Sequence, residues 1–199
     1  MEMILATHNL DKCKELQATF IDTNIKILTL QDFPDIEEII EDGNTLEENA
    51  FIKSKTVFNL TNIPTISDDT GLEVDALNGA PGIYSARYAG EQCSYSDNVN
   101  KLLLDMENIE EKNRTATFKT VVTYVSKDLE LVAEGSVKGL ITRKPYGRKG
   151  FGYDPIFYVL SENKTFAEMN INEKQKISHR AKSINNLKKL FSKHQLFSN

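Results

Sequence analysis

The stretch Ile66–Gly90, ISDDTGLEVDALNGAPGIYSARYAG, is the most informative part of this chain. A short β-type run, Thr65–Ser67, leads directly into two adjacent carboxylates, Asp68 and Asp69, and then into a Thr-Gly break. Adjacent aspartates repel one another and are depleted in strands, so this pair needs a counter-charge. Mg²⁺ is the simplest one, because it binds one or two carboxylates together with substrate phosphates. For the pair taken alone, a solvated acidic turn is the alternative interpretation.

The strand that carries these carboxylates constrains how they act. Successive strand residues point to opposite faces, so Asp68 and Asp69 cannot both face one ion while the strand stays regular. The Thr70–Gly71 break relaxes this constraint, and we expect one aspartate to bind the ion while the other supports it. After the break, Leu72–Leu77 can continue the sheet, and Ala80–Gly82 forms a turn.

The composition is that of an ordinary soluble globular protein. With 199 residues, of which 40% are hydrophobic and 27% charged, the chain fits one domain, or one domain in two lobes. A net charge of −5 argues against broad, sequence-independent nucleic-acid binding. It does not exclude a phosphorylated small molecule, for which a few local lysines and arginines suffice.

Three features predict a cytoplasmic protein. The N-terminal segment MEMILATHN has no basic lead and is therefore no signal peptide. No apolar stretch approaches the roughly 18 residues that a membrane-spanning helix needs. Cys13 and Cys93 lie far apart without metal-ligand spacing, which favours free thiols in a reducing compartment.

Helix-like and strand-like segments alternate along the chain. The strands are expected at Met3–Ala6, Ile25–Leu30, Thr65–Asp69, Thr115–Val125, Leu129–Val137 and Ile156–Val159. The helices are expected at Leu10–Ile21, from Leu46 to Phe58 behind a capping box at Thr45–Glu48, around Val99–Met106, and after an N-cap at Ser178. Arg143–Gly152, rich in glycine and basic residues, is expected to be a loop. The alternation, with one hairpin-like pair of strands, predicts a mixed α/β sheet.

A candidate anion site lies where the first strand meets the first helix. It comprises the run Thr7, His8, Asn9, Leu10, Asp11 and Lys12. The unpaired N–H groups and the positive dipole end of a helix start favour a bound anion, and Lys12 adds a full charge. The run is not the glycine-rich loop GxxxxGK[ST], which occurs nowhere in the chain. An N-cap followed by a surface lysine is the alternative.

A further carboxylate, Glu41, precedes the second helix and could join the aspartate pair at a cation. Lys53 lies about two turns into the helix that follows. The other acidic residues nearby are interpreted as surface charge: Glu37, Glu38, Asp42, Glu47 and Glu48.

The C-terminal half carries another candidate in two pieces. The run Phe151–Asp154, FGYD, places an aromatic ring beside open backbone, which suits stacking on a base. His179 and Arg180 would lie in the first turn of the last helix as donors for an anion or a carbonyl oxygen. Taken alone, a His-Arg pair is more often part of the surface than of a site.

Five segments together resemble the non-standard purine nucleoside-triphosphate pyrophosphatases, the inosine-triphosphate pyrophosphatase (XTP/dITP diphosphatase) type. They are ILATHNLDKCKEL, EDGNTLEENAFIKSK, SDDTGLEVDALNGAPGIYSARYAG, GFGYDPIF and EKQKISHRAKSINNL, and they run in order from residue 4 to about residue 187. The resemblance implies one domain over residues 1–199 with an α/β fold: two lobes on a long bent mixed sheet flanked by helices, with the active cleft between the lobes. It also implies a homodimer.

The resemblance implies hydrolysis of ITP, dITP and XTP to the monophosphate and pyrophosphate, with Mg²⁺ as cofactor, which cleanses the nucleotide pool. Asp69 and Asp68 would then be catalytic, with Asp69 as the proposed proton acceptor, and Glu41 and Asp69 would bind the metal. The residues implied in substrate binding are Thr7, His8, Asn9, Leu10, Asp11, Lys12 and Lys53 for the phosphate chain, Thr70, then Phe151, Gly152, Tyr153 and Asp154 for the base and ribose, and Lys174, His179 and Arg180 for the base pocket.

Three positions depart from the pattern of that family. His8 stands where glycine is common, Thr70 where serine is common, and Ala181 where glycine often follows the His-Arg pair. Thr70 keeps the hydroxyl, and Ala181 suits a helix better than glycine does. His8 removes backbone freedom beside the phosphates. None of the three changes removes a proposed catalytic group.

Base choice and two competing functions complete the hypothesis. A 6-keto purine accepts a hydrogen bond where adenine donates one, so donors such as Arg180 and backbone N–H groups near Phe151 would select it. A nucleotide sensor that does not cleave is one competing function, and the retained carboxylates argue against it. A pyrophosphatase for dTTP or UTP is the other, and the FGYD and ISHR segments argue for purines instead.

Overall fold

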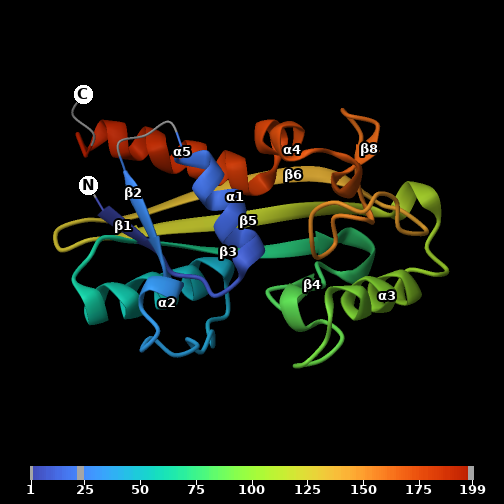
Figure 1. Cartoon of the computed structure of the whole chain (residues 1–199). Helices are drawn as coiled ribbons and strands as arrows, with labels where there is room; N and C mark the ends of the chain where they lie inside the picture. Colours follow the sequence, from blue (N-terminus) through green and yellow to red (C-terminus); the bar gives the residue numbers. More distant parts are fainter. Residues whose placement is uncertain (1, 22–24, 197–199) are drawn as a thin grey trace. The chain divides into compact units, whose positions relative to one another are not determined.

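The computed structural model describes residues 2–21 and 25–196, and within them the chain forms an eight-stranded mixed sheet with five α-helices (Figure 1). The strands are β1 (Glu2–Leu5), β2 (Lys26–Thr29), β3 (Thr65–Val74), β4 (Pro81–Gly82), β5 (Thr115–Val125), β6 (Glu130–Ile141), β7 (Phe157–Val159) and β8 (Lys164–Thr165). The helices are α1 (Leu10–Thr19), α2 (Leu46–Thr61), α3 (Tyr95–Asp105), α4 (Ile171–Ile177) and α5 (His179–Lys193).

The strand order is β2-β1-β3-β5-β6-β7-β8, and β4 pairs with β3 off this path. Strand β1 runs parallel to β2 and to β3, whereas β4 is antiparallel to β3 and β7 is antiparallel to both β6 and β8. Strands β5 and β6 are neighbours joined by a short turn, in which the Ser126 N–H donates to the Leu129 carbonyl at 2.9 Å. The predicted mixed α/β sheet and its hairpin are therefore confirmed.

The predicted break at Thr70–Gly71 is wrong, because β3 runs without interruption from Thr65 to Val74. The strand has neighbours on both sides in the sheet order, and its residues are mostly buried. Pairing and burial of this kind outweigh the local tendency of a Thr-Gly pair to end a strand. Elements β4, β8 and α4 are short and were not predicted, whereas the predicted loop Arg143–Gly152 contains neither helix nor strand.

The chain divides into two compact units. The boundary between them falls within β3, β5 and β6, so each of these three strands contributes residues to both units. Unit 1 comprises the chain up to Asp69, Thr120–Gly135, and the residues from His179 onward. Unit 2 comprises Thr70–Lys119 and Ser136–Ser178. None of the helices in the described part of the chain is long and apolar enough to cross a membrane.

Unit 1 has a separate core on each face of its strands. Alternate residues of β1 point in opposite directions, so Met3 and Leu5 join one cluster while Ile4 and Ala6 join another. The first cluster is closed by apolar side chains of α1 and α5, and the second by Val57 of α2. Figure 1 accordingly shows α1 and α5 on one side of these strands and α2 on the other. Each face of β3 in this unit therefore meets different helices.

Unit 2 has its own core, built around a cluster of aromatic rings. Phe118 of β5 lies 4.7 Å from Phe157 of β7, centroid to centroid, and Phe157 stacks on Phe166 at 5.2 Å. Beside this cluster, the buried guanidinium of Arg114 donates to the carbonyls of Ile141, Met106 and Thr142 at 2.6–3.0 Å. Such a cation, satisfied by backbone oxygens alone, fixes the segments that it joins.

Candidate active site

The loop after β1 is fixed by the cap of helix α1. The Asn9 side-chain oxygen accepts hydrogen bonds from the backbone N–H groups of Asp11 at 3.0 Å and Lys12 at 3.1 Å. The Asn9 N–H in turn donates to the Thr7 hydroxyl at 3.2 Å. Asn9 is thus an N-cap, as one interpretation of the sequence held. Lys12 is no ordinary surface lysine, however, because its ammonium lies 3.6 Å from Asp68.

Asp68 lies on the face of β3 that meets α1 and α5, where two cations surround it. Its carboxylate accepts from the Arg180 Nε at 3.1 Å, and the Arg180 guanidinium also pairs with Glu15 of α1. Burial acts to raise the pKa of Asp68, but the charges of Lys12 and Arg180 outweigh it and hold that pKa well below its usual range. Asp68 is therefore a buried, ionised carboxylate at neutral pH.

Asp69 lies on the opposite face of β3, which meets α2. The Lys53 ammonium contacts Glu41 at 2.6 Å and Asp69 at 3.6 Å, so it brings these two carboxylates to one point. Burial acts to lower the pKa of Lys53, but the charges of Asp69 and Glu41 outweigh it and raise that pKa. The amide nitrogen of Asn49 donates to the other oxygen of Asp69 at 3.3 Å.

The five other acidic residues of this region behave as predicted. Glu37, Glu38, Asp42, Glu47 and Glu48 are all exposed. Within residues 2–21 and 25–196, no group of three or more His, Cys, Asp and Glu side chains is arranged to hold a metal ion. Carboxylate oxygens of Glu41 and Asp69 both lie beside one nitrogen, the Lys53 ammonium. This donor set suits Mg²⁺, which takes one or two carboxylates and completes its shell with phosphates and water.

His179 and Arg180 open helix α5, and both are buried. A Cβ at Gly135 of β6 would lie 2.1 Å from the His179 carbonyl oxygen, so only glycine lets the strand approach the helix start this closely. The guanidinium of Arg180 is directed at Asp68 and Glu15. Its expected role as a donor to the base stays a prediction.

Unit 2 holds the remaining predicted residues, and Asp154 organises them. One oxygen of Asp154 accepts from the Phe151 N–H at 2.9 Å and from the Lys174 ammonium at 2.6 Å. That ammonium also lies 5.1 Å from the centre of the Phe151 ring, within the range of a cation–π contact. Gly150 has φ +72°, and a Cβ there would lie 2.0 Å from the same oxygen of Asp154.

The other three residues predicted in this unit differ in exposure. Tyr153 is buried in the unit 2 core and donates through its hydroxyl to the Ser85 carbonyl at 2.9 Å. Gly152 is partly buried and has φ +60°, a conformation that favours glycine. Thr70 is the first residue of unit 2 and is partly exposed. Tyr153 therefore anchors the FGYD segment, while Phe151 keeps a partly exposed ring.

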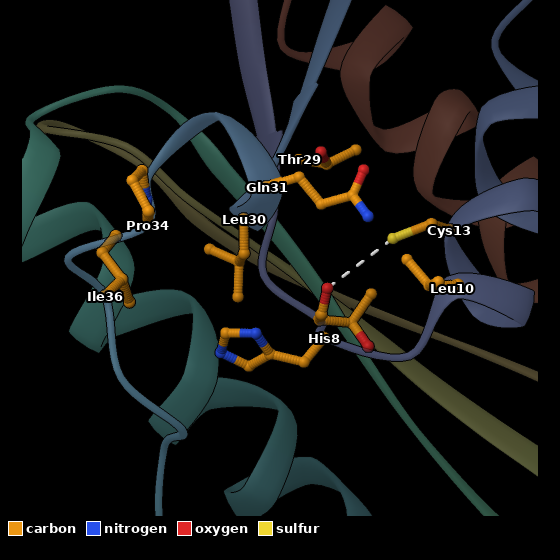
Figure 2. Close-up of a pocket in the computed structure, with 9 residues that line it drawn as sticks. His8, Leu10, Cys13, Thr29, Leu30, Gln31, Pro34 and Ile36 are labelled. Atoms are coloured by element: carbon orange, nitrogen blue, oxygen red, sulfur yellow. Dashed lines mark hydrogen bonds between the residues drawn. The ribbon is translucent and has the colours of Figure 1, made fainter.

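A pocket of about 350 Å³ lies beside the Thr7–Lys12 loop (Figure 2). Its lining contains no Asp, Glu, Lys or Arg and comprises Thr7, His8, Leu10, Cys13, Thr29, Leu30, Gln31, Pro34 and Ile36. The Cys13 thiol donates to the Thr7 carbonyl at 3.6 Å, and burial raises the pKa of that thiol. His8 approaches the Glu37 carbonyl at 3.4 Å, which ties the loop to the segment that leads to Glu41.

Two site residues were missed by the sequence interpretation, Asn49 and Glu15. Asn49 lies one helical turn before Lys53, so the two share a face of α2, and that spacing was a usable signal. The inward side of this helix was assigned to Leu46, Ala50, Phe51, Ser54, Val57 and Phe58, yet Asn49 and Lys53 are buried as well. Glu15 gave no local signal, because its partner Arg180 is 165 residues away.

The chain is similar to known proteins of one family. The sequence model of the Ham1 family matches residues 3–190. A protein named dITP/XTP pyrophosphatase from Thermoanaerobacter pseudethanolicus is 45% identical over 188 residues, covering 94% of this chain and 95% of that protein. The protein of the same name from Bacillus subtilis is 43% identical over 190 residues, covering 95% of this chain and 96% of that protein.

A solved structure shows the same fold. The Staphylococcus aureus Ham1 protein superposes with a TM-score of 0.87 at 39% sequence identity. The match covers 98% of this chain and 100% of that one.

Proposed function

The chain belongs to the Ham1 family, and on this premise we propose that it hydrolyses non-standard purine nucleoside triphosphates to the monophosphate and pyrophosphate. Its substrates are dITP and XTP, the nucleotides in the names of its relatives, together with ITP. The enzyme thereby removes deaminated purines from the nucleotide pool.

One observation carries the proposal: Lys53 contacts both Glu41 and Asp69, at 2.6 and 3.6 Å. Helix α2 and the start of β3 separate the two carboxylates in sequence, yet both lie against one ammonium. A protein that only binds nucleotides has little need for a buried lysine between paired carboxylates. The arrangement suits a phosphoryl-transfer site, in which cations offset the charge of the triphosphate.

The residues of unit 1 divide the chemistry among them. Lys12 and Lys53 hold the phosphate chain, and the loop from Thr7 to Asp11 aligns it at the start of α1. Asp69 accepts the proton of a water molecule whose oxygen attacks the α-phosphorus. The bond from that phosphorus to the bridging oxygen breaks, and pyrophosphate leaves. Asp68 holds Lys12 and Arg180 in place and is too strongly ionised to be a good base.

Mg²⁺ is the proposed cofactor, and Glu41 and Asp69 are the residues that would hold it. When bound, the ion supplies a Lewis acid that polarises a phosphoryl oxygen and favours ionisation of water. The pair fits because Mg²⁺ needs few protein carboxylates when a triphosphate is present. The Lys53 ammonium lies beside these two carboxylates, and its positive charge attracts the phosphates even before the ion binds.

The residues of unit 2 recognise the base and ribose. Phe151 offers a ring for stacking, and Lys174 is held beside it by Asp154. One oxygen of the Asp154 carboxylate holds the Lys174 ammonium and the Phe151 N–H, and Asp154 also contacts the base or ribose in this proposal. Thr70, Gly152, His179 and Arg180 complete the proposed substrate contacts.

The test is a turnover panel with pyrophosphate release as the readout. We expect dITP, XTP and ITP to be cleaved with Mg²⁺, and ATP, GTP and dTTP to be poor substrates. Chelation of the metal should abolish release. Binding of dITP without any release of pyrophosphate would instead make the chain a nucleotide sensor, and preferred cleavage of dTTP would make it a pyrimidine enzyme.

Three further proposals accompany this function. The chain acts as one pyrophosphatase domain over residues 1–199, of which Met1, residues 22–24 and residues 197–199 lie outside the described part. It forms a homodimer, which sedimentation equilibrium would test. It works in the cytoplasm, where its substrates arise.

A further inference from the structure

We propose that Asn49 is a positioning residue, which holds the Asp69 carboxylate and the loop that carries Glu41 in one fixed arrangement. The inference deepens the proposed function and rests on it, because it concerns the same pair of carboxylates. Asn49 acts on the chemistry through Asp69 and through the loop that carries Glu41.

The hydrogen bonds of Asn49 define its task. Its side chain is almost fully buried, with 2% of the residue exposed. The amide nitrogen donates to the Asp69 Oδ2 at 3.3 Å, and the amide oxygen accepts from the Gly43 N–H at 2.9 Å. A carboxylate only accepts and a backbone N–H only donates, so the orientation of the amide is set by its partners. Aspartate or leucine at this position would lose the donor.

The loop packs closely against Asn49. A Cβ at Gly43 would lie 2.7 Å from the Asn49 Oδ1 and 2.7 Å from the Glu48 Cβ. Any larger residue would push the loop, and Glu41 with it, away from the helix. Glycine at 43 and asparagine at 49 thus form one contact. Helix α2 is a firm base for this contact, because the Thr45 hydroxyl caps it by accepting from the Glu48 N–H.

Lys53 completes the support of Asp69 from the same helix. Asn49 and Lys53 are four residues apart and share one face of α2. Asn49 contacts one oxygen of Asp69 and Lys53 contacts the other, at 3.6 Å. The carboxylate is therefore held at both oxygens from one rigid element. Asn49 holds Asp69 with a neutral amide, whereas Asp68 is held by two cations, Lys12 and Arg180. The negative charge of Asp69 is therefore less compensated and attracts a cation more strongly.

Two substitutions test the role of Asn49. Asn49→Leu keeps the volume and removes both hydrogen bonds, and Asn49→Ala gives a second variant if the first folds poorly. Asn59, exposed on the same helix, supplies the matched controls Asn59→Leu and Asn59→Ala. Residues that orient metal ligands typically affect activity or metal affinity by about 10- to 100-fold. We expect a fall in kcat of this size for dITP in the Asn49 variants, with KM nearly unchanged, and wild-type kinetics in the controls.

A second readout works without turnover. Mn²⁺ binding, followed by electron paramagnetic resonance with a non-hydrolysable dITP analogue, should weaken about 10-fold or more in Asn49→Leu and stay unchanged in Asn59→Leu. Unchanged kcat and unchanged Mn²⁺ affinity in folded Asn49 variants would overturn the inference. The inference would also be overturned if the loss of activity in the Asn49 variants were fully explained by a loss of folded protein, as measured by thermal melts. Failure of the wild-type chain to release pyrophosphate, with Mn²⁺ binding still dependent on Asn49, would refute the proposed function alone. A wild-type chain that binds no Mn²⁺ would refute both.

Discussion

The two faces of β3 present neighbouring aspartates to very different surroundings. On the α1 and α5 face, Asp68 is fully buried and meets the cations of Lys12 and Arg180. On the α2 face, Asp69 is 8% exposed and meets a neutral amide and the ammonium of Lys53. Adjacent carboxylates on one strand are thus separated by the strand itself, and each receives its own partners.

The difference shows how one Asp-Asp pair can serve stability and chemistry at once. Lys12, Arg180 and Lys53 supply counter-charge to the two aspartates, which the sequence had led us to expect. Asp68 is enclosed by positive charge and suited to hold other groups. Asp69 shares its cation with Glu41, which leaves an excess of negative charge on that face.

The largest expected effect is the loss of stability on the Asp68 face. Asp68→Asn leaves Arg180 and Lys12 beside a neutral amide, which we expect to lower the free energy of unfolding by about 3 kcal/mol. This is the lower end of the usual range for a broken buried ion pair, because Glu15 still pairs with Arg180. Urea denaturation at neutral pH measures it. The matched change Asp69→Asn should lower the free energy of unfolding by about 1 kcal/mol or less. Equal losses for the two variants would contradict the different roles of the two faces.

The next effect is the loss of turnover on the Asp69 face. Asp69→Asn keeps the shape of the side chain but removes a charge and a proton acceptor, so kcat for dITP should fall on the order of 10²-fold or more. Steady-state kinetics on the folded variant measures it, with thermal melts as the control for folding. Near-normal turnover would mean that the chemistry does not depend on this carboxylate.

The pH dependence of stability tests the assignment on the Asp68 face. The folded-state pKa of Asp68 is held below its unfolded value of about 3.9. The stabilisation by Asp68 is therefore fully present above about pH 4 and is lost as the pH falls below that value toward the folded-state pKa. The difference in unfolding free energy between wild type and Asp68→Asn should be constant near neutral pH and shrink in acid. A difference that grows in acid would contradict the assignment.

The smallest effect concerns Glu15, the outer member of the Asp68 face. Glu15→Gln keeps a hydrogen-bond acceptor for Arg180 and removes a partly exposed charge, so the loss of stability should be about 1 kcal/mol. The kcat for dITP should stay within about 2-fold of wild type, because Glu15 lies on the face that does not carry Asp69. A large loss of turnover would show that turnover depends on the contact between Glu15 and Arg180.

Local signals in the sequence predicted much of this arrangement. The Asn9 and Thr45 caps, the strand before Asp68, and the opposite directions of the two aspartates all follow from neighbouring residues. The continuity of β3 through Thr70–Gly71 did not, because it depends on neighbouring strands rather than on the local sequence.

The partners of the site residues were harder to predict than the residues themselves. The expected contact of Arg180 with the base stays a prediction, and the structure adds Asp68 and Glu15 as its partners, from distant parts of the chain. Asn49 was missed because it was not assigned to the inward side of α2, although it is buried there. Buried polar residues at helical spacing therefore indicate a site as usefully as exposed ones do.

The most direct test is a crystal structure with Mn²⁺ and a non-hydrolysable dITP analogue, in which anomalous scattering locates the metal. The account predicts one Mn²⁺ bound by oxygens of Glu41, Asp69 and the phosphate chain, in the place proposed for Mg²⁺. A metal bound by Asp68, or an ordered analogue whose metal lies away from both Glu41 and Asp69, would contradict it.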